Sequence, residues 1–306
     1  MTPDVSVLIV SWNTRELTLR CLDSLPASVD DGTSFETIVV DNASRDGTAE
    51  ALGGRGDALV VANRENRGFA GGVNQAYALS RGELVLLLNS DVELAPGSLS
   101  TLARFLRAHP RAAGVGPLYL DPDGSPQPFH YRFPTLPAML ASASGPLRRL
   151  PPLARSVRRY GMLDDDFAAA RAVPQPSASC LLLRRSCLPP DRLLDERYPV
   201  YFNDVALARQ LAAAGFELWV TPAATVRHVH GASTRLLGRR LARQHIGAFV
   251  RYLRAWEPRY KLACFRAVVL VQKLAAWTLR RGDALPPREL LAALRGDPGP
   301  LPQAPE

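Results

Sequence analysis

The sequence predicts an α/β fold in which a parallel sheet carries helices on both faces. Short apolar runs alternate with segments of helical periodicity through residues 5–108. This rhythm is typical of βαβ units, whose right-handed crossovers place helices on the two faces of a sheet. Residues 84–88 are apolar without interruption, as expected of an interior strand that is covered on both sides. With 306 residues, 47% of them hydrophobic, the chain is long enough to bury a full core.

The predicted elements follow one another along the chain, and Pro110 ends the last helix of the first half. Strands are expected at residues 5–10, 37–40, 59–62 and 84–88, and helices at 14–24, 72–80 and 98–108, with a helix start at 48–52. Residues 121–176 are rich in Pro, Arg and Ala and have weak periodicity, so a long surface excursion with helical pieces is expected there. A second structured block begins at residue 178 and runs through 234.

The C-terminal part is the basic part of the chain. Residues 235–281 contain 12 Lys or Arg and one acidic residue, whereas residues 1–234 are almost neutral. An amphipathic helix is predicted at 241–256, and four basic residues then recur every seven positions: Arg259, Arg266, Lys273 and Arg280. No stretch of 18 uncharged residues is present to span a bilayer. Two interpretations stay open: a helix lying in the interface of an anionic membrane, and a helix packed on the body.

These features predict three parts. Residues 1–234 form the main domain, divided into a first half (1–120), the excursion (121–176) and a second half (177–234). Residues 235–296 form a basic helical extension, and residues 297–306 form a Pro-rich, disordered tail. The four cysteines are scattered and no secretory leader precedes residue 5, so a reduced cytoplasmic setting is expected. Because the body is nearly neutral, nucleic acid is not expected as a partner.

Polar residues follow three of the predicted strands. The carboxyl ends of parallel strands share one crevice, which is the usual place for a nucleotide. Neither GxGxxG nor GxxxxGK[ST] occurs, so another means of holding phosphates is needed, and a metal at Asp91 is the simplest one. The residues at these strand ends are Ser11, Trp12 and Asn13 after the first, Asp41 after the second, and Asn89, Ser90 and Asp91 after the fourth.

Four motifs of the first 120 residues resemble the family 2 glycosyltransferases, and their rhamnosyltransferase-like subgroup of bacterial polysaccharide assembly in particular. The motifs are VLIVSWN at 7–13, VVDNASRDGT at 39–48, NRGFAGGVN at 66–74 and LLLNSD at 86–91. The similarity continues in register to about residue 234. It implies the GT-A fold with a mixed, mainly parallel sheet, to which this chain adds C-terminal amphipathic helices. It also implies that residues 1–234 are a catalytic domain, with a nucleotide-binding half at 1–120 and an acceptor or catalytic half at 177–234. It also implies a nucleotide-sugar donor, a divalent metal, Mn²⁺ or Mg²⁺, and inversion at the anomeric carbon.

The resemblance also implies which residues hold the metal. Asp91 matches the metal aspartate of the family's DxD-type motif, with Asn89 where some relatives have another carboxylate. The segment VRHVHGAST at 226–234 resembles the family's VxHxxGxS segment, which makes His228 the second ligand. His230, two residues further along a strand, would point the same way and is a possible additional contact.

The general base implied by the resemblance is Asp204. Residues 194–207, LDERYPVYFNDVAL, match the family's FDExFFxYxEDxDLxxR pattern, with Asn203 in place of Glu and Ala206 in place of the second Asp. Asn203 is expected to N-cap a helix, and the helix dipole to keep Asp204 ionised in its first turn. Ala206 can neither accept a proton nor hold a hydroxyl group, which is the clearest departure from the pattern.

The donor site is expected to combine a base pocket with a glycine-rich loop. In the family the aspartate after the second strand reads the pyrimidine edge, and a carboxylate that accepts from ring N3–H favours uracil or thymine. The expected nucleotide-sugar contacts are Ser11, Trp12, Asn13, Asp41, Asn66, Gly68, Gly71, Asn74, Asn89 and Ser90.

The expected function is therefore transfer of a sugar from dTDP-rhamnose or a UDP-sugar to a glycan or polyprenyl-linked acceptor. The enzyme is expected at the inner face of the plasma membrane as a peripheral protein. Two alternatives stay open: a sugar-1-phosphate nucleotidyltransferase, and a catalytically impaired scaffold of the same fold at the membrane, which Ala206 favours.

Overall fold

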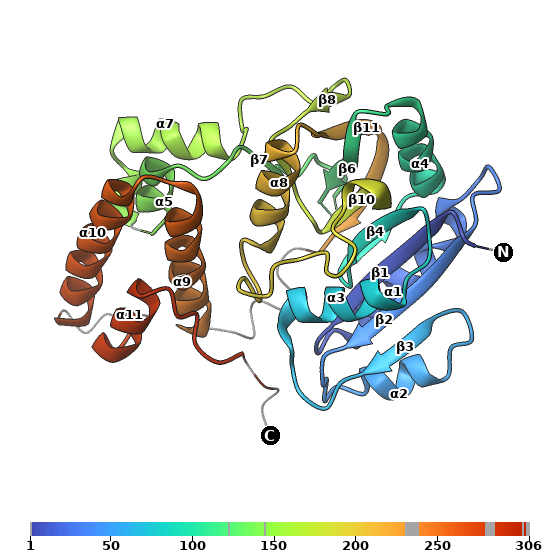
Figure 1. Cartoon of the computed structure of the whole chain (residues 1–306), viewed down its shortest axis with the longest axis horizontal. Coiled ribbons are helices and arrows are strands. Elements are labelled where there is room, and N and C mark those ends of the chain that lie inside the picture. The colour runs from blue at the N-terminus through green and yellow to red at the C-terminus, as the bar shows by residue number, and fades with distance from the viewer. Residues whose placement is uncertain are drawn as a thin grey trace.

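The computed structural model describes residues 2–121, 123–143, 145–229, 239–278, 285–301 and 303. Its centre is a nine-stranded sheet in the order β3-β2-β1-β4-β10-β6-β11-β5, with β8 paired to β11 (Figure 1). The strands are β1 (Val5–Ser11), β2 (Phe35–Asp41), β3 (Leu59–Ala62), β4 (Leu84–Asn89), β5 (Val92–Leu94), β6 (Ala112–Leu120), β8 (Arg171–Ala172), β10 (Cys180–Arg184) and β11 (Glu217–His228). A separate pair joins β7 (His130–Tyr131) to β9 (Gln175–Pro176).

The sheet is mixed and mainly parallel, as predicted. Strands β3, β2, β1 and β4 run parallel, whereas β10 runs antiparallel to both β4 and β6. Residues 84–88 are all buried, which agrees with an interior strand covered on both faces. Because β1 lies between β2 and β4, the ends of these three strands meet at one edge of the sheet.

Helices cover both faces of the sheet. One face packs against α1 (Arg15–Ser24), α2 (Thr48–Gly53) and α4 (Ser98–Ala108), and the other against α3 (Gly68–Leu79) and α8 (Asn203–Ala213). Every strand and helix predicted in residues 5–108 is present, with small shifts at its ends. The largest shift is in α3, which begins at Gly68 rather than at residue 72 because Gly68 has a positive φ of 76° at the helix start.

The excursion and the C-terminal extension together form a third apolar layer beside the sheet. It contains α5 (Leu136–Ala143), α6 (Gly145–Arg148), α7 (Pro151–Tyr160), α9 (Arg239–Trp256), α10 (Arg259–Thr278) and α11 (Pro287–Leu294) (Figure 1). One buried cluster joins α5, the start of α8, α9, α10 and α11. The apolar side of α9 is therefore packed on the body, with Phe249 and Leu253 each 1% exposed. The predicted domain boundary at residue 234 lies outside the described residues.

Two predictions about irregular segments are wrong. Residues 121–176 are not only a surface excursion, because β7 and β9 pair inside the molecule and His130 is buried. The described part of the predicted disordered tail also packs on the body. Asp297 forms an ion pair with Arg243 at 2.8 Å, and the Gln303 side chain accepts a hydrogen bond from the Asn66 backbone at 3.1 Å.

The close contact between α3 and β1 predicts that alanine substitutions at Gly72 and Gly53 change the stability in opposite directions. A Cβ at Gly72 would lie 2.9 Å from Val10 Cγ1, whereas a Cβ at Gly53 in α2 would meet nothing within 4 Å. Gly72→Ala should lower the free energy of unfolding by about 1–3 kcal/mol through overpacking. Gly53→Ala should raise it by up to about 1 kcal/mol through helix propensity. Urea unfolding of both variants tests this, and equal stabilities would contradict the proposed packing of α3 on β1.

Candidate active site

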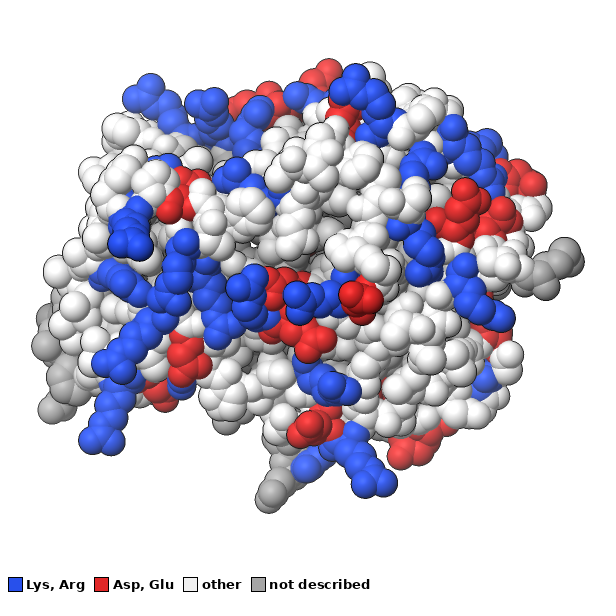
Figure 2. Space-filling model, viewed as in Figure 1, with Lys and Arg blue, Asp and Glu red and all other residues white. Residues whose placement is uncertain are grey.

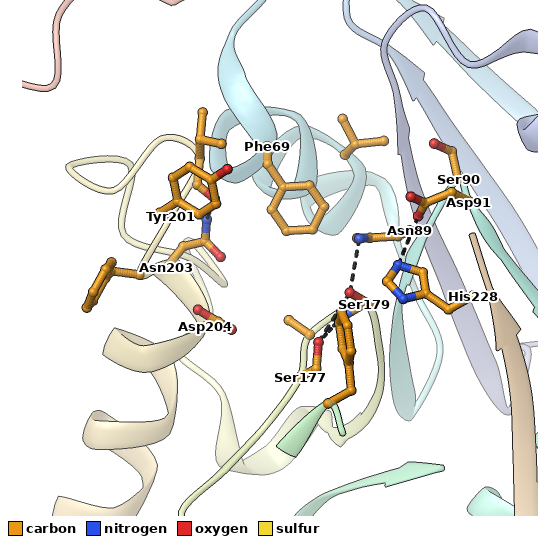
Figure 3. Close-up of a pocket in the computed structure, with 15 residues that line it drawn as sticks. Phe69, Asn89, Ser90, Asp91, Ser177, Ser179, Tyr201, Asn203, Asp204 and His228 are labelled. Atoms are coloured by element: carbon orange, nitrogen blue, oxygen red, sulfur yellow. Dashed lines mark hydrogen bonds and ion pairs between the residues drawn. The ribbon is translucent and has the colours of Figure 1, made fainter. Parts of the chain in front are cut away.

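A cavity of about 340 Å³ opens where β1 and β4 end (Figure 3). Five of the predicted site residues line it: Asn89, Ser90, Asp91, Asp204 and His228. Asp91 and His228 lie at one end of the close-up view and Asp204 lies at the other, with Ser177 and Ser179 between them (Figure 3). One cavity therefore brings together residues from three distant parts of the chain.

Asp91 and His228 are neighbours because two strands pair antiparallel. The chain turns at Ser90 and Asp91 between β4 and β5, and His228 at the end of β11 lies opposite Val92 of β5. The backbone N–H of Val229 donates to the Asp91 carbonyl at 3.0 Å, which extends the ladder by one bond. Both side chains are largely buried, and His228 Nε2 lies 3.5 Å from Asp91 Oδ1.

A residue of the excursion orients His228. The Gln127 side chain donates from Nε2 to Asp121 at 2.6 Å, which turns its Oε1 toward His228 Nδ1 at 3.0 Å. With this amide orientation, Nδ1 carries the proton and donates it to Gln127, and Nε2 is the nitrogen that faces Asp91. A polar partner on the second nitrogen is typical of a histidine that acts as a metal ligand.

Asp204 is held differently from the prediction. Phe202, with φ of 68°, is the residue before α8, so Asn203 is the first residue of the helix and not its N-cap. The Asn203 side chain instead donates to the carbonyls of Tyr198 and Val200. Asp204 accepts hydrogen bonds from the Val205 backbone at 2.8 Å and from Gln175 Nε2 at 3.1 Å.

Burial raises the pKa of the Asp204 carboxyl, and the hydrogen bonds from Val205 and Gln175 oppose that rise only in part. The expectation that the helix dipole keeps Asp204 ionised leaves out desolvation, which is the first cause of the pKa shift and disfavours the charged form. Gln175 is buried, and its Oε1 has no hydrogen-bond partner among the described residues.

Ala206, the clearest departure from the family pattern, does not face the cavity. It is 2% exposed and packs with Val205 and the aromatic side chains of α9 in the third apolar layer. A carboxylate at this position would be buried among apolar side chains, which is costly without a partner. In this chain the alanine completes a packed surface behind Asp204.

Of the residues expected in the base pocket, Asp41 and Trp12 each have a polar atom available for a ligand, whereas the Ser11 hydroxyl is already hydrogen-bonded. Asp41 is 1% exposed, its Oδ2 accepts from the Ser44 backbone at 3.1 Å, and its Oδ1 has no partner among the described residues. Burial raises the pKa of Asp41. Trp12 is also buried with its Nε1 unpartnered in the described structure. Ser11 instead bonds Thr14 and Thr18 in a buried cluster of hydroxyl groups.

Two of the residues expected at the donor site, Asn74 and Gly71, have structural roles. All the side-chain bonds of Asn74 are made with residues 193–196: it donates to Leu194 and Glu196 and accepts from Leu193 and Leu194. These four bonds use both N–H groups and the carbonyl oxygen of the amide, so Asn74 joins α3 to residues 193–196. Gly71 lies inside α3, so the glycine-rich segment is a helix start and not a loop.

The remaining residues expected to contact the donor also form hydrogen bonds within the protein. Asn13 has φ of 52° and its side chain accepts from the Arg45 backbone at 2.8 Å. Asn66 accepts from the Gly68 backbone at 2.8 Å, and a Cβ at Gly68 would lie 2.8 Å from the Pro199 carbonyl oxygen. The Asn89 side chain donates to Ser179 at 3.1 Å, and Ser90 bonds Thr14 at 2.9 Å. His230 lies outside the described residues.

Residues 6–186 match the family described as Glycosyl transferase family 2. The chain belongs to glycosyltransferase family 2. An N-acetylglucosaminyl-diphospho-decaprenol L-rhamnosyltransferase of Mycobacterium tuberculosis is 31% identical to it over 248 residues, which cover 76% of this chain and 78% of that protein. The family predicted from the motifs is thereby confirmed, and the protein is a glycosyltransferase.

Solved structures confirm the GT-A fold of this glycosyltransferase. A mannosyltransferase of Pyrobaculum calidifontis, solved with GDP-Man and Mn²⁺, superimposes with a TM-score of 0.57 at 20% identity over 95% of this chain and 79% of that one. The transferase GalNAc-T7, solved with UDP, GalNAc and Mn²⁺, gives 0.60 at 16% identity over 85% of this chain and 49% of its own.

Several residues of the glycosyltransferase site were not found from the sequence. Gln127 and Gln175 lie in the Pro-rich stretch, where no periodicity or motif marks a single glutamine. The aromatic residues that line the cavity carry no distinctive spacing either, although all but Phe129 lie inside quoted motifs: Phe69, Phe129, Tyr201 and Phe202.

The raised pKa of Asp204 predicts how stability depends on pH. A carboxyl whose pKa is higher in the folded state contributes stability below its unfolded value of about 3.9, and this is lost as the pH rises through the folded pKa. Asp204→Asn should therefore raise the melting temperature near pH 7 by roughly 2–4 °C for each 1 kcal/mol relieved. The gain should vanish near pH 3, where both side chains are neutral.

Asp31→Asn is a control in which the melting temperature is expected to change in the opposite direction. Hydrogen bonds from Thr33 and Ser100 lower the pKa of Asp31, so its carboxylate stabilises the fold above the unfolded value. Asp31→Asn should lower the melting temperature at pH 7. A calorimetric scan in which Asp204→Asn also melted lower at pH 7 would show that burial does not govern this carboxyl.

Proposed function

We propose that this glycosyltransferase inverts the anomeric carbon as it moves a sugar from a nucleotide-diphosphate donor to a hydroxyl acceptor. The observation that carries the proposal is the cavity in which Asp91 and His228 lie at one end and Asp204 at the other (Figure 3). An inverting transfer needs a charged site for the leaving diphosphate and a separate base for the acceptor, and the two ends of the cavity supply these groups.

The residues at the Asp91 end fit a divalent cation, Mn²⁺ or Mg²⁺. A carboxylate oxygen and an imidazole nitrogen 3.5 Å apart are both suitable donors, and the imidazole favours Mn²⁺ over Mg²⁺. When bound, such a cation neutralises the charge that develops on the diphosphate. Asn89 contributes no charge, so we expect the nucleotide diphosphate to complete the binding site and the cation to bind weakly without it.

Asp204 is the proposed general base. Its carboxylate lies on the cavity wall, and Gln175 and the Val205 backbone fix its orientation. Because burial raises its pKa, the ionised carboxylate is a stronger base than that of an exposed aspartate. It accepts the proton of the acceptor hydroxyl as the oxygen attacks the anomeric carbon.

The donor is proposed to be dTDP-rhamnose or a UDP-sugar. The Asp41 Oδ1 atom, which has no partner among the described residues, is suited to accept the N3–H of uracil or thymine. Trp12 follows Ser11, which pairs with Asp41 across β1 and β2, and its buried Nε1–H is also unpartnered in the described structure. We also assign donor contacts to Asn13, Asn66, Gly68, Asn89 and Ser90. The name of the mycobacterial relative supports rhamnose as the sugar and a polyprenyl-linked glycan as the acceptor.

The two alternative functions have less support. A nucleotidyltransferase needs a basic phosphate loop after the first strand, where this chain has Trp12 and Asn13 followed by Thr14. The scaffold hypothesis depended on Ala206, which lies in the apolar layer behind Asp204 and takes no part in the cavity. Within the described residues, no helix is both long and apolar enough to cross a bilayer, and we propose a peripheral enzyme at the cytoplasmic face.

Substitutions at the Asp91 end should separate direct from indirect effects on metal binding. Asp91→Asn should lower turnover at least about a hundredfold, because it removes a charge from the leaving-group site. Gln127→Leu should weaken Mn²⁺ binding about 10–100-fold through loss of the His228 orientation. Electron paramagnetic resonance of Mn²⁺ with UDP present measures the affinity independently of turnover. Asp164→Asn, at an exposed aspartate paired to Arg158, is the control, and equal losses in it would overturn the assignment.

Asp41 should determine the preference for the base. In Asp41→Asn the amide oxygen must accept from the Ser44 N–H, so the amide N–H₂ faces the ligand in place of Oδ1. Uracil presents N3–H there, whereas cytosine presents an acceptor. Binding of UDP should fall roughly 10-fold or more, and CDP should gain relative to UDP. A thermal-shift series with UDP-, dTDP-, CDP- and GDP-sugars and Mn²⁺ tests this. Unchanged UDP stabilisation in the variant would place the base elsewhere.

A further inference from the structure

Helix α10 has two apolar faces, and only one of them is used in packing. Leu262, Phe265 and Val269 are buried against α5, α9 and α11, at 9%, 2% and 0% exposure. This face accounts for the attachment of the helix to the protein. It does not account for the apolar residues on the opposite side.

The outer face of α10 is an exposed apolar stripe. Tyr260 and Val271 are each 68% exposed and Leu274 is 38% exposed. The exposed Ala263, Cys264 and Ala267 fill the positions between them, so the members recur every three or four residues and line one side of the helix. We call these six residues the α10 stripe. A monomeric soluble protein rarely leaves such a stripe uncovered.

A groove between α10 and α11 widens this surface. Ala267 and Leu270 of α10 face Leu291 and Leu294 of α11, with Arg266 and Arg295 at the rim, around a space of about 300 Å³. Leu291 is itself 47% exposed. The apolar surface therefore continues from the stripe on to a second helix.

The apolar surface is bordered by cations. Arg259, Arg266 and Lys273 follow one another at seven-residue spacing along one side of α10, and the helix contains no acidic residue. Arg266 donates to the Leu294 carbonyl, and Arg254 of α9 donates to the Arg295 carbonyl, so both point toward backbone and not toward a carboxylate. Figure 2 shows Lys and Arg side chains gathered over the end of the molecule that carries α9, α10 and α11.

We propose that the α10 stripe and its cationic border bind the surface of an anionic lipid bilayer. A helix with an apolar face between basic residues lies in the interface plane, with its apolar side chains among the acyl chains and its cations at the headgroups. A second copy of the chain is a poorer occupant. Two such faces packed together would bring basic rows against basic rows, with no acidic residue on either α10.

The bound surface would be coupled to the active site through packed rings. Phe265 of α10 contacts Phe249 of α9 with ring centroids 4.7 Å apart, and Phe249 contacts Phe202 at 5.7 Å. Phe202 directly precedes Asn203 and Asp204. If the proposed function holds, membrane binding through α10 sets the cavity at a fixed height above the bilayer, where a lipid-linked acceptor is presented.

Flotation of the full chain with vesicles tests the proposal. Wild type is expected to float with vesicles of phosphatidylcholine and phosphatidylglycerol at 7:3 and much less with phosphatidylcholine alone. Val271→Glu with Leu274→Glu should lower the partition coefficient at least roughly tenfold. Arg259→Gln with Lys273→Gln should lower it roughly 25-fold on anionic vesicles and reduce the preference between the two compositions by the same factor.

Matched variants keep the result interpretable. Leu59→Glu with Leu79→Glu places the same charges on exposed leucines of β3 and α3, which are 52% and 45% exposed, and should float as wild type does. Equal flotation of the stripe variant and this control overturns the proposal. So does a wild-type dimer in solution that the stripe variant converts to a monomer without any flotation of wild type.

The test also separates this proposal from the proposed function. Asp204→Asn should float as wild type does while losing donor turnover. The stripe variant should retain hydrolysis of a water-soluble nucleotide sugar and its thermal transition while losing flotation. Loss of flotation alone concerns the membrane surface, and loss of turnover alone concerns the active site.

Discussion

The antiparallel pairing of β5 with β11 is the constraint on which the active site depends. Strand β5 has three residues, and each pairs with one residue of β11: Leu94 with Val226, Glu93 with Arg227 and Val92 with His228. The buried side chains of Val92, Leu94 and Val226 hold this register, because a slip by one residue would expose them. Asp91 and His228 are adjacent only in this register. A short ladder of apolar residues thus determines the relative position of the Asp91 and His228 side chains.

The opposite end of the cavity is organised by burial. Asp204 sits at the start of a helix whose other side, Val205 and Ala206, is embedded in the apolar layer formed with α9. Burial raises the pKa of the carboxyl and so costs stability at neutral pH, and the apolar contacts behind it offset that cost. This arrangement explains why an alanine is tolerated at position 206. The helical extension therefore supports the cavity wall, whatever else its outer face binds.

The parts of the structure that could be predicted from the sequence are those with local signals. The unbroken apolar run before Asn89, and the polar residues after each early strand, correctly placed one edge of the sheet. The family motifs correctly brought Asp91, His228 and Asp204 to one cavity. Gln127 and Gln175 could not be predicted, because each is a single amide in a stretch without periodicity, and its role depends on strand pairing between distant segments. The start of α3 was misplaced because glycines usually signal a loop, whereas close packing on Val10 and on the Pro199 carbonyl requires them here.

The two ends of the cavity are built from different kinds of segment. The end that contains Asn89 and Asp91 follows β4 of the central sheet, whose residues 84–88 are all buried. The end proposed for the acceptor is built from residues 200–204, and residues 177–179 lie between the two ends (Figure 3). These residues lie outside the strands of the sheet, so they can change without breaking it. Gln127 and Gln175 reach from the stretch 121–176 to His228 and Asp204. Substitutions at 177–179 and 200–204 can therefore alter the Asp204 end of the cavity while the Asp91 end keeps its geometry, provided that the two glutamine contacts are retained.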